Sequence, residues 1–425
     1  MYFRITRRFL HHLFRFVPLA IISLLLAANP ATAQDPDWSI YLYDNATQEL
    51  VSVDAGGSQN TLPLEIPENR FVGGYDLEFS NDGTRAAYCR PVDEGSAGPG
   101  GSPSQLNVVD LTNGETLAAV DIDANVGCRA TELDSVTGEV AVGVVYEYSG
   151  GETGADTILW ALIIVDPTTG DILHSLDNTD SVAGMDDYLA ENPLMMDVQL
   201  IDAGQVSFHA LMWGTEGQAA PPAYTWNPEA NTLETTPELS RASFETLPDT
   251  GEAVWLELDE TLSAAETGSP VAPLNVVKYQ TPGSEPETIY YTADWVLLDV
   301  QFADNGQAIL VQMLEGATMT TDPGMVTSSV TRWVRLNRDG TVEEVAQVDG
   351  FSQAAPAPDG FVLLQTLNVS EADQPTRTEL FYYRDDTRET LWSIEQDDNR
   401  AVTWSIAWQP PLTAEDDLPP FPAFG

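Results

Sequence analysis

The chain has 425 residues, of which 66 are acidic and 17 are basic, so its formal net charge is −49. A charge of this size argues against nucleic acid and anionic membranes as partners, because both would be repelled. The two cysteines and four histidines show no signature of a zinc site, which needs four separated ligands.

Residues 1–33 have the features of a secretory signal peptide. Four arginines and no acid precede the apolar run 16–28, and Ala31-Thr32-Ala33 is a cleavage site that predicts Gln34 as the mature N-terminus. The apolar run is shorter than the ~20 residues that span a bilayer, although an uncleaved anchor is an alternative. Residues 6–10 resemble a twin-arginine signal, so the general secretory and twin-arginine routes both stay open. Cleavage would leave a net charge near −53.

The rest of the chain shows short alternating apolar runs bounded by turn residues, a pattern typical of strands and hairpins. One half-repeat, a strand, a turn and a strand, occurs six times, and its turn glycines are spaced by 55, 66, 47, 55 and 54 residues. These glycines are Gly83, Gly138, Gly204, Gly251, Gly306 and Gly360. A second half-repeat lies between the copies of the first. Its clearest copies are Leu106–Glu115 and Ile163–Asp171, and weaker ones start near Ser39, Tyr224, Asn275, Trp333 and Leu380.

Two hairpins per repeat make a four-stranded antiparallel blade, and radial repetition of such blades makes a β-propeller. We therefore predict an all-β fold of seven blades, with six as the alternative, and consider a β-sandwich improbable. With strands lettered a to d outward from the axis, Ser39–Val53 would supply strands c and d of the closing blade, and Val402–Gln409 its strand a. The predicted organisation is a signal peptide (1–33), a propeller (34–412) and an acidic, proline-rich tail (413–425).

Three stretches resemble known propellers. Leu77–Gly83 and Pro356–Gly360 are similar to the strand–Ser-Pro-Asp-Gly pattern of the Tol-system periplasmic propeller, and Val165–Asp171 resembles propellers of the YVTN type. The Trp-Asp and Gly-His signatures of WD repeats are absent, so any likeness to WD propellers is at the level of the repeat. The resemblance implies a fold and no particular activity.

The Asp and Asn residues before the turn glycines are first of all turn residues, because the following glycine supplies the positive φ of a tight hairpin. Asp121–Gly127 alternates oxygen side chains, but its glycine is one place late for an EF-hand loop and the closing Glu is missing. No cofactor or metal is therefore predicted, with calcium kept as an unproven possibility.

The connections between strands differ in length in a regular way. The b–c connections are long, as are two d–a connections, and alternating strand directions place all of them on one face. Insertions that gather on one face often mark a binding face, and the alternative is that these connections are solvated spacers. They are 92–105, 147–157, 214–222, 259–273, 315–329 and 368–376, with 54–74 and 177–194.

Catalytic patterns are sparse. His174 and His209 lie on expected strands, where a lone histidine is usually structural. No Gly-x-Ser-x-Gly, His-Glu-x-x-His or phosphate-binding glycine pattern is present. Acid pairs such as Asp186-Asp187 could serve carboxylate chemistry, but in so acidic a chain such pairs arise by chance. Trp295 and Trp404 lie at strands a, where a tryptophan either packs between blades or offers a ring to a ligand.

Five arginines share one expected face. Four fall at the start of strands a and one at the end of a strand b, namely Arg70, Arg129, Arg241, Arg400 and Arg90. They could form an anion or acidic-peptide site, or each could pair with an acid and tie blades together. Cys89 and Cys128 end and begin neighbouring strands on this face, so we predict a disulfide, with two buried thiols as the alternative.

Three functions are compatible with these features. The favoured one is an exported binding or scaffold propeller that holds a protein, peptide or glycan on its long-connection face. The second is a carboxylate-using hydrolase or lyase on the same face, and the third is a structural envelope protein without a pocket. An enzyme is the less favoured class. We expect a monomer that is secreted or located in the periplasm or cell envelope, with no membrane segment after signal cleavage.

Overall fold

The structure is a computed structural model, and the strands described below all lie in its unit Trp38–Gly425. The described residues are 38–44, 47, 49–62, 64, 77–91, 104–122, 127–133, 140–149, 157–177, 182–186, 189, 193–201, 205–212, 223–235, 242–247, 250–259, 274–293, 295–315, 318–319, 326–327, 330–367, 376–384, 387–396, 404–412 and 418–424. The predicted signal peptide lies outside them.

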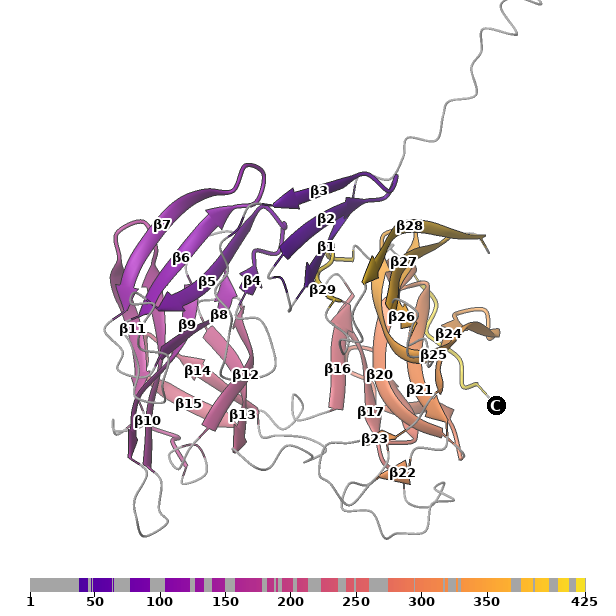
Figure 1. The fold of residues 1–425 in the computed structure, drawn as a ribbon. Coiled ribbons are helices and arrows are strands. Elements are labelled where there is room, and N and C mark those ends of the chain that lie inside the picture. Colours follow the sequence, from indigo (N-terminus) through magenta and orange to yellow (C-terminus); the bar gives the residue numbers. More distant parts are fainter. Residues whose placement is uncertain are drawn as a thin grey trace, which may run out of the picture. The chain divides into compact units, whose positions relative to one another are not determined.

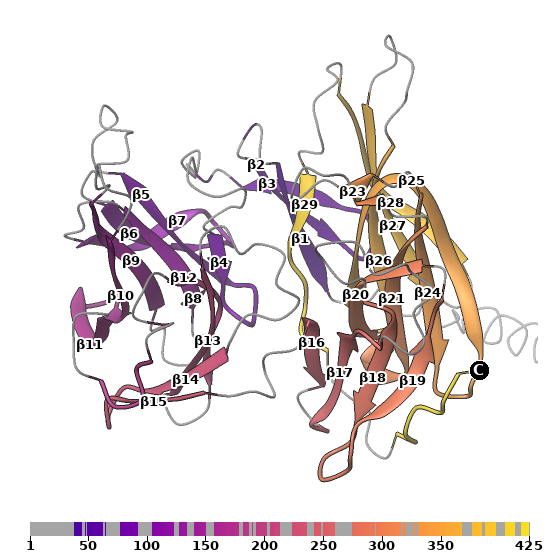
Figure 2. The same ribbon diagram turned by 90° about the horizontal axis from the view of Figure 1, so that it is seen from below.

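The first and last strands of the chain share one sheet, which we call the closing blade (Figure 2). Its order is β29 (Trp404–Trp408), β1 (Ser39–Asp44), β2 (Glu49–Asp54) and β3 (Gln59–Leu62). The pairing of N-terminal strands with a C-terminal strand a is confirmed. The expected roles of the N-terminal strands need one correction. Ser39–Val53 was expected to supply strands c and d, but β1, β2 and β3 are strands b, c and d of this blade. The third strand, β3, was missed because it is polar and mostly exposed.

Four further blades follow in chain order (Figure 1). Blade 1 consists of β4 (Leu77–Phe79), β5 (Arg85–Pro91), β6 (Ser104–Asp110) and β7 (Glu115–Ile122). Blade 2 consists of β8 (Gly127–Leu133), β9 (Val140–Ser149), β10 (Thr157–Asp166) and β11 (Asp171–Asp177). Blade 3 consists of β12 (Pro193–Ile201), β13 (Gln205–Met212), β14 (Ala223–Asn227) and β15 (Thr232–Thr235). Blade 4 consists of β16 (Ala242–Leu247), β17 (Glu252–Glu257), β18 (Val276–Gln280) and β19 (Glu287–Tyr291).

The remaining seven-stranded sheet contains two blades that share one strand, β25 (Val342–Ala357). In blade 5 the order is β20 (Trp295–Ala303), β21 (Ala308–Glu315), β24 (Val330–Asn337) and the first half of β25. In blade 6 the second half of β25 is followed by β26 (Gly360–Leu367), β27 (Thr376–Arg384) and β28 (Thr387–Gln396). A 3-10 turn η3 (Asp304–Gly306) joins β20 to β21, and β22 (Thr318–Met319) pairs with β23 (Val326–Thr327). The prediction of an all-β propeller with six or seven four-stranded blades is confirmed.

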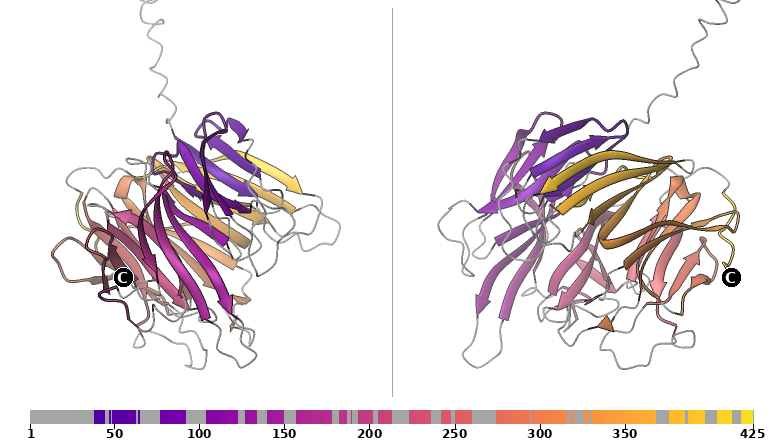
Figure 3. Two further views of the ribbon diagram at one scale, coloured as in Figure 1. Left: turned by 90° about the vertical axis from the view of Figure 1, so that its left-hand side faces the viewer. Right: turned by 45° about the vertical axis from the view of Figure 1, so that its right-hand side comes forward.

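The core consists of apolar layers between successive blades, whose twisted sheets are seen from two sides in Figure 3. Neighbouring residues of β10 point to opposite layers. Ile163 and Val165 pack toward blade 1, whereas Leu162 and Ile164 pack toward blade 3. Because both faces of a blade are covered, its middle strands are apolar at consecutive positions, which explains the run Leu162–Val165.

The short turns are held by the side chains that the repeat pattern singled out. In the turn after β6, the Asp110 carboxylate accepts hydrogen bonds from the Thr112 N–H at 2.7 Å and the Thr112 hydroxyl at 2.5 Å. Gly114, at φ 73°, closes the same turn. In the turn after β4, Asp82 accepts a hydrogen bond from the Ser80 hydroxyl at 2.7 Å. These aspartates therefore act as turn residues.

Antiparallel order places the b–c and d–a connections at one end of the strands and the a–b and c–d turns at the other. The long intervals, such as 92–103 and 258–275, all fall at the first end. We call this end the loop face and the other end the turn face. Among the described residues, no helix has the length and apolar character needed to cross a bilayer.

Candidate functional site

The loop face carries an aromatic–cation contact on blade 5. Trp295 begins β20, and the guanidinium carbon of Arg332 on β24 lies 4.2 Å from the centre of its ring. Arg332 Nε lies 3.1 Å from a carboxylate oxygen of Glu344. Trp295 is partly exposed, and Leu298 on the same strand is 40% exposed. This group, which we call the loop-face stack (Trp295, Arg332 and Glu344), presents an apolar ring and a charge together.

Trp404, the second tryptophan considered as a ligand platform, has a different setting. It is 1% exposed and packs edge-on against Trp392, with ring centroids 4.8 Å apart. Both belong to the apolar layer between blade 6 and the closing blade. Trp404 thus has the setting of an inter-blade packing residue and offers no exposed ring to a ligand in this structure.

A repeating set of hydrogen bonds joins the first strands of neighbouring blades. The Val300 N–H of β20 donates to Ser243 Oγ of β16 at 2.9 Å, and the Phe302 N–H donates to the carboxyl of Glu245. The first strand is an edge of its sheet, so its outward N–H and C=O groups have no partner strand. Side chains of blade 4 satisfy these groups in blade 5.

The same contact recurs one and two blades further on. The Gln301 side-chain amide of β20 donates to the Ala354 carbonyl oxygen of β25 at 3.1 Å. The Ile406 N–H of β29 donates to Gln353 Oε1 at 3.0 Å. Polar side chains of the first strands therefore connect blades 4, 5 and 6 and the closing blade in series.

Two carboxyl groups, those of Glu245 and Asp299, lie close together among these hydrogen-bonded side chains. The Ser243 hydroxyl donates to Asp299, and Asp299 lies close enough to Glu245 to affect its titration. Burial above all, with the charge of Asp299, raises the pKa of Glu245 from 4.5 to about 8, against the opposing effect of the Phe302 N–H. Glu245 therefore carries a proton at neutral pH beside a second carboxyl group, an arrangement that suits general acid–base chemistry.

These five residues, which we call the first-strand cluster, were not recognised as a site from the sequence (Ser243, Glu245, Asp299, Gln301 and Gln353). The available signal was the alternation of polar residues in Ser243–Glu245 and Asp299–Gln301, at positions where both faces of a blade are otherwise apolar. The acid pair Asp186-Asp187 has a structural use at its described member, since Asp186 accepts hydrogen bonds from the Tyr224 hydroxyl at 3.0 and 3.1 Å.

The side chains of the five arginines proposed as an anion site lie outside what the structure describes. Arg70, Arg241 and Arg400 are not among the described residues, and Arg90 and Arg129 lie on β5 and β8 with side chains that are not described. The described arginines that form ion pairs with carboxylates are Arg332, Arg335, Arg338, Arg377 and Arg384.

The cysteine and metal predictions concern partly described segments. Cys89 on β5 is disulfide-bonded, and the chain has only one other cysteine, Cys128, whose side chain is not described. Among the described residues there is no group of three or more His, Cys, Asp or Glu side chains that could hold a metal. The candidate calcium stretch Asp121–Gly127 is only partly described, because 123–126 lie outside.

Comparison with known proteins gives no family. No protein-family model matches the chain, and no curated protein is similar in sequence. Among solved structures, the chain is similar to an acylaminoacyl peptidase from Pyrococcus horikoshii, with TM-score 0.45 and 12% identity, over 81% of this chain and 47% of that one. It therefore spans about half the length of the peptidase.

Two other similar structures cover most of their own chains. The β-propeller domain of the Trilobed protease from Pyrococcus furiosus has TM-score 0.43 and 13% identity, over 81% of this chain and 89% of that one. An oligogalacturonate lyase in complex with manganese has TM-score 0.45 and 14% identity, over 81% and 88%. Likeness at this level carries no argument about activity, and the strand topology described above defines the fold.

Proposed function

We propose that this protein is an exported binding propeller that holds a protein, peptide or glycan on its loop face. The observation that carries the proposal is the loop-face stack, in which a partly exposed Trp295 ring lies under the Arg332 guanidinium. Trp and Arg are the residues most enriched at the energetic centres of binding surfaces. The long connections leave and rejoin the strands at the same end.

Binding can be tested without knowing the ligand. A random peptide library and a glycan array would be screened with the full chain, and the best ligand would be titrated against two variants. Trp295→Ala should weaken binding by about tenfold or more, as expected for loss of an aromatic contact at the centre of an interface. The control is Ile172→Ala, which truncates a side chain that is 58% exposed at the turn-face end of β11. Equal affinities of the wild type and Trp295→Ala would contradict the proposal.

A second candidate function is acid–base catalysis by Glu245 and Asp299. It is favoured by the geometry of the first-strand cluster, in which Ser243 donates to Asp299 and the Phe302 N–H donates to Glu245, and burial raises the pKa of Glu245. Aryl glycosides, aryl esters and uronate oligosaccharides would be the substrates assayed. If protonated Glu245 is the general acid, turnover should fall as the pH rises through about 8. Glu245→Gln should abolish it. Turnover that survives this substitution, or its absence with every substrate, would leave only a structural role for the pair.

A further inference from the structure

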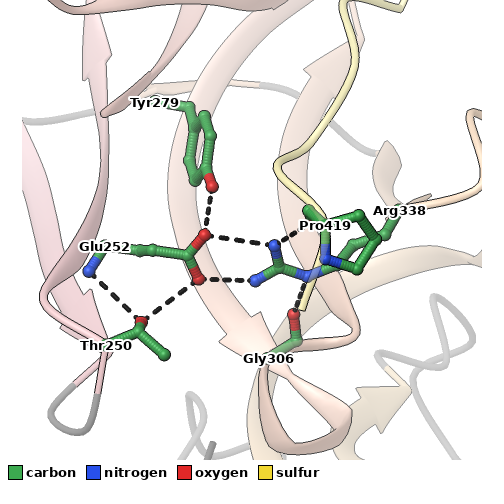
Figure 4. A network of polar contacts seen from close by, with 6 residues as sticks. All are labelled: Thr250, Glu252, Tyr279, Gly306, Arg338 and Pro419. Atoms are coloured by element: carbon green, nitrogen blue, oxygen red, sulfur yellow. Dashed lines mark hydrogen bonds and ion pairs between the residues drawn. The ribbon is translucent and has the colours of Figure 1, made fainter. Parts of the chain in front are cut away.

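A buried polar network joins blades 4 and 5 on the turn face (Figure 4). Arg338 donates to the Glu252 carboxylate at 2.6 and 3.1 Å, and the two side chains are only 3% and 7% exposed. Arg338 Nε also donates to the Gly306 carbonyl at 2.6 Å. Glu252 accepts further hydrogen bonds from the hydroxyls of Tyr279 and, at 3.2 Å, Thr250. Each of these groups belongs to blade 4, to blade 5 or to their turns.

The C-terminal segment (Leu418–Phe424) lies against this network. Phe421 and Phe424 are its anchors and are 4% and 6% exposed. The guanidinium carbon of Arg338 lies 4.1 Å from the centre of the Phe421 ring, and the same guanidinium donates to the carbonyl oxygen of Pro419. Arg338 is therefore enclosed between a carboxylate on one side and an aromatic ring of the segment on the other.

Further contacts line the groove that the segment occupies. The Phe421 ring meets Tyr279 edge-on at 5.4 Å and Phe302 at 6.4 Å between centroids. The Phe424 N–H donates to the carbonyl oxygen of Ile289 at 2.6 Å. One wall of the groove thus comes from blade 4 and the other from blade 5. The segment adds no strand to either sheet.

The segment has the chemistry of a docked peptide. Prolines at 419, 420 and 422 fix φ and favour an extended conformation, which lowers the entropy lost on docking. Proline-rich peptides dock in aromatic-lined grooves in several recognition domains. Of the hydrogen bonds that Arg338 donates, those to Glu252 and Gly306 do not involve the segment. These contacts within blades 4 and 5 would hold Arg338 in place for an incoming peptide.

We propose that this groove is a recognition site for extended, proline-rich peptides with two phenylalanines three residues apart, and that the C-terminal segment is its intramolecular occupant. The site lies at the opposite end of the strands from the loop-face stack, so it does not depend on the function proposed for that face.

The test uses the full chain and a labelled synthetic peptide of residues 413–425. A chain carrying Phe421→Ala and Phe424→Ala keeps its groove but weakens its own ligand, so it should bind the peptide saturably. The wild-type chain should bind at least about tenfold more weakly, because its tethered segment competes at high effective concentration. Ile172→Ala is the matched control and should behave like the wild type. A peptide with both phenylalanines replaced by alanine should not bind.

No saturable binding by a doubly substituted chain with wild-type circular dichroism would overturn the proposal, as would equal binding by that chain and the wild type. A second experiment leaves the anchors intact, in case the double variant does not fold. Residues 413–417 are replaced by a site-specific protease sequence, and the chain is cleaved after purification. Native mass spectrometry should show that the labelled peptide replaces the cleaved segment. A segment that stays bound without exchange would be a permanent structural strap, and one that leaves without replacement would show no recognition.

Discussion

At the scale of single residues, two ion pairs of the chain differ chiefly in exposure. The side chains of Arg338 and Glu252 are 3% and 7% exposed, whereas those of Arg332 and Glu344 are 29% and 48% exposed. Removing one member of a buried pair leaves an uncompensated charge and costs about 3–5 kcal/mol. An exposed pair contributes about 1 kcal/mol or less.

We therefore expect Glu252→Ala to lower the free energy of unfolding by about 3–5 kcal/mol and Glu344→Ala by less than about 1 kcal/mol. Urea denaturation of the two variants and the wild type at neutral pH measures both changes. Similar small losses for the two variants would mean that water reaches Arg338 once its carboxylate is removed.

The raised pKa of Glu245 predicts that stability changes with pH in the opposite direction to that expected for a salt-bridged acid. The folded chain keeps the Glu245 proton up to about pH 8, whereas the unfolded chain loses it near 4.5. The folded state therefore binds more protons in this window, and stability falls as pH rises, by at most about 1.4 kcal/mol per pH unit. Unfolding at constant ionic strength should show this fall in the wild type and a smaller one in Glu245→Gln. Parallel profiles would argue against a raised pKa.

At the scale of elements, the closing blade is sensitive at one turn glycine. Gly83, at φ 64°, follows β4, and a Cβ there would lie 2.5 Å from the Trp408 ring of β29. Gly283, at φ 76°, follows β18 and has nothing within 4 Å of its Cβ position. Both substitutions to alanine incur the strain of a positive φ, and only the one at Gly83 meets a ring.

We expect Gly283→Ala to cost about 1–2 kcal/mol from backbone strain alone. Gly83→Ala should cost a further ~1–3 kcal/mol, because an added methyl group in a packed site forces neighbours to shift. The difference between the two unfolding free energies isolates the contact between blade 1 and β29. Equal losses would show that Trp408 moves aside freely.

The strands between turns were predictable, because turn glycines and alternating apolar residues are local signals. The polar sequence of β3 carries no such signal, since three of its four residues are exposed. Asp349-Gly350 is a dipeptide typical of turns, yet β25 runs through it because Asp349 pairs with β24 and Gly350 with β26. Pairing with neighbouring strands decided the outcome at both places.

The first-strand cluster could not be predicted for a related reason. Its contacts join residues 53 to 57 positions apart, one blade along the chain. The repeat indicates which residues occupy equivalent strands, but it does not show which side chain reaches the backbone of the next blade. Arg338 is easier to recognise from the sequence as an unusual residue. It is a basic residue in the turn after β24, whereas the equivalent turns of the two clearest repeats have Leu111 and Pro167.

At the scale of the whole molecule, charge repulsion should limit stability. The mature chain would carry about −53 charges, and self-repulsion in the compact state is relieved by screening ions. The melting temperature should therefore rise from low salt to molar sodium chloride. A flat or falling midpoint would show that the acidic surface does not limit stability.

The disulfide makes a separate prediction about the whole chain. Cys89 is disulfide-bonded, and pairing with Cys128 would close a loop between blades 1 and 2. In the chain-entropy description, closing a loop of this length stabilises the fold by roughly 4 kcal/mol. Mass spectrometry after unfolding in an alkylating agent without reductant should find no modified cysteine, and two modified cysteines would disprove the bond.

The shared strand β25 has a consequence for how the molecule comes apart. Its 16 residues form the outer strand of blade 5 and then the first strand of blade 6. Because no turn separates the two halves, we expect the two blades to open as one cooperative unit in hydrogen exchange. The same unit also contains Phe302, the residue of blade 5 that contacts Phe421 in the peptide groove. Opening blade 6 would therefore loosen a site that its own residues do not contact.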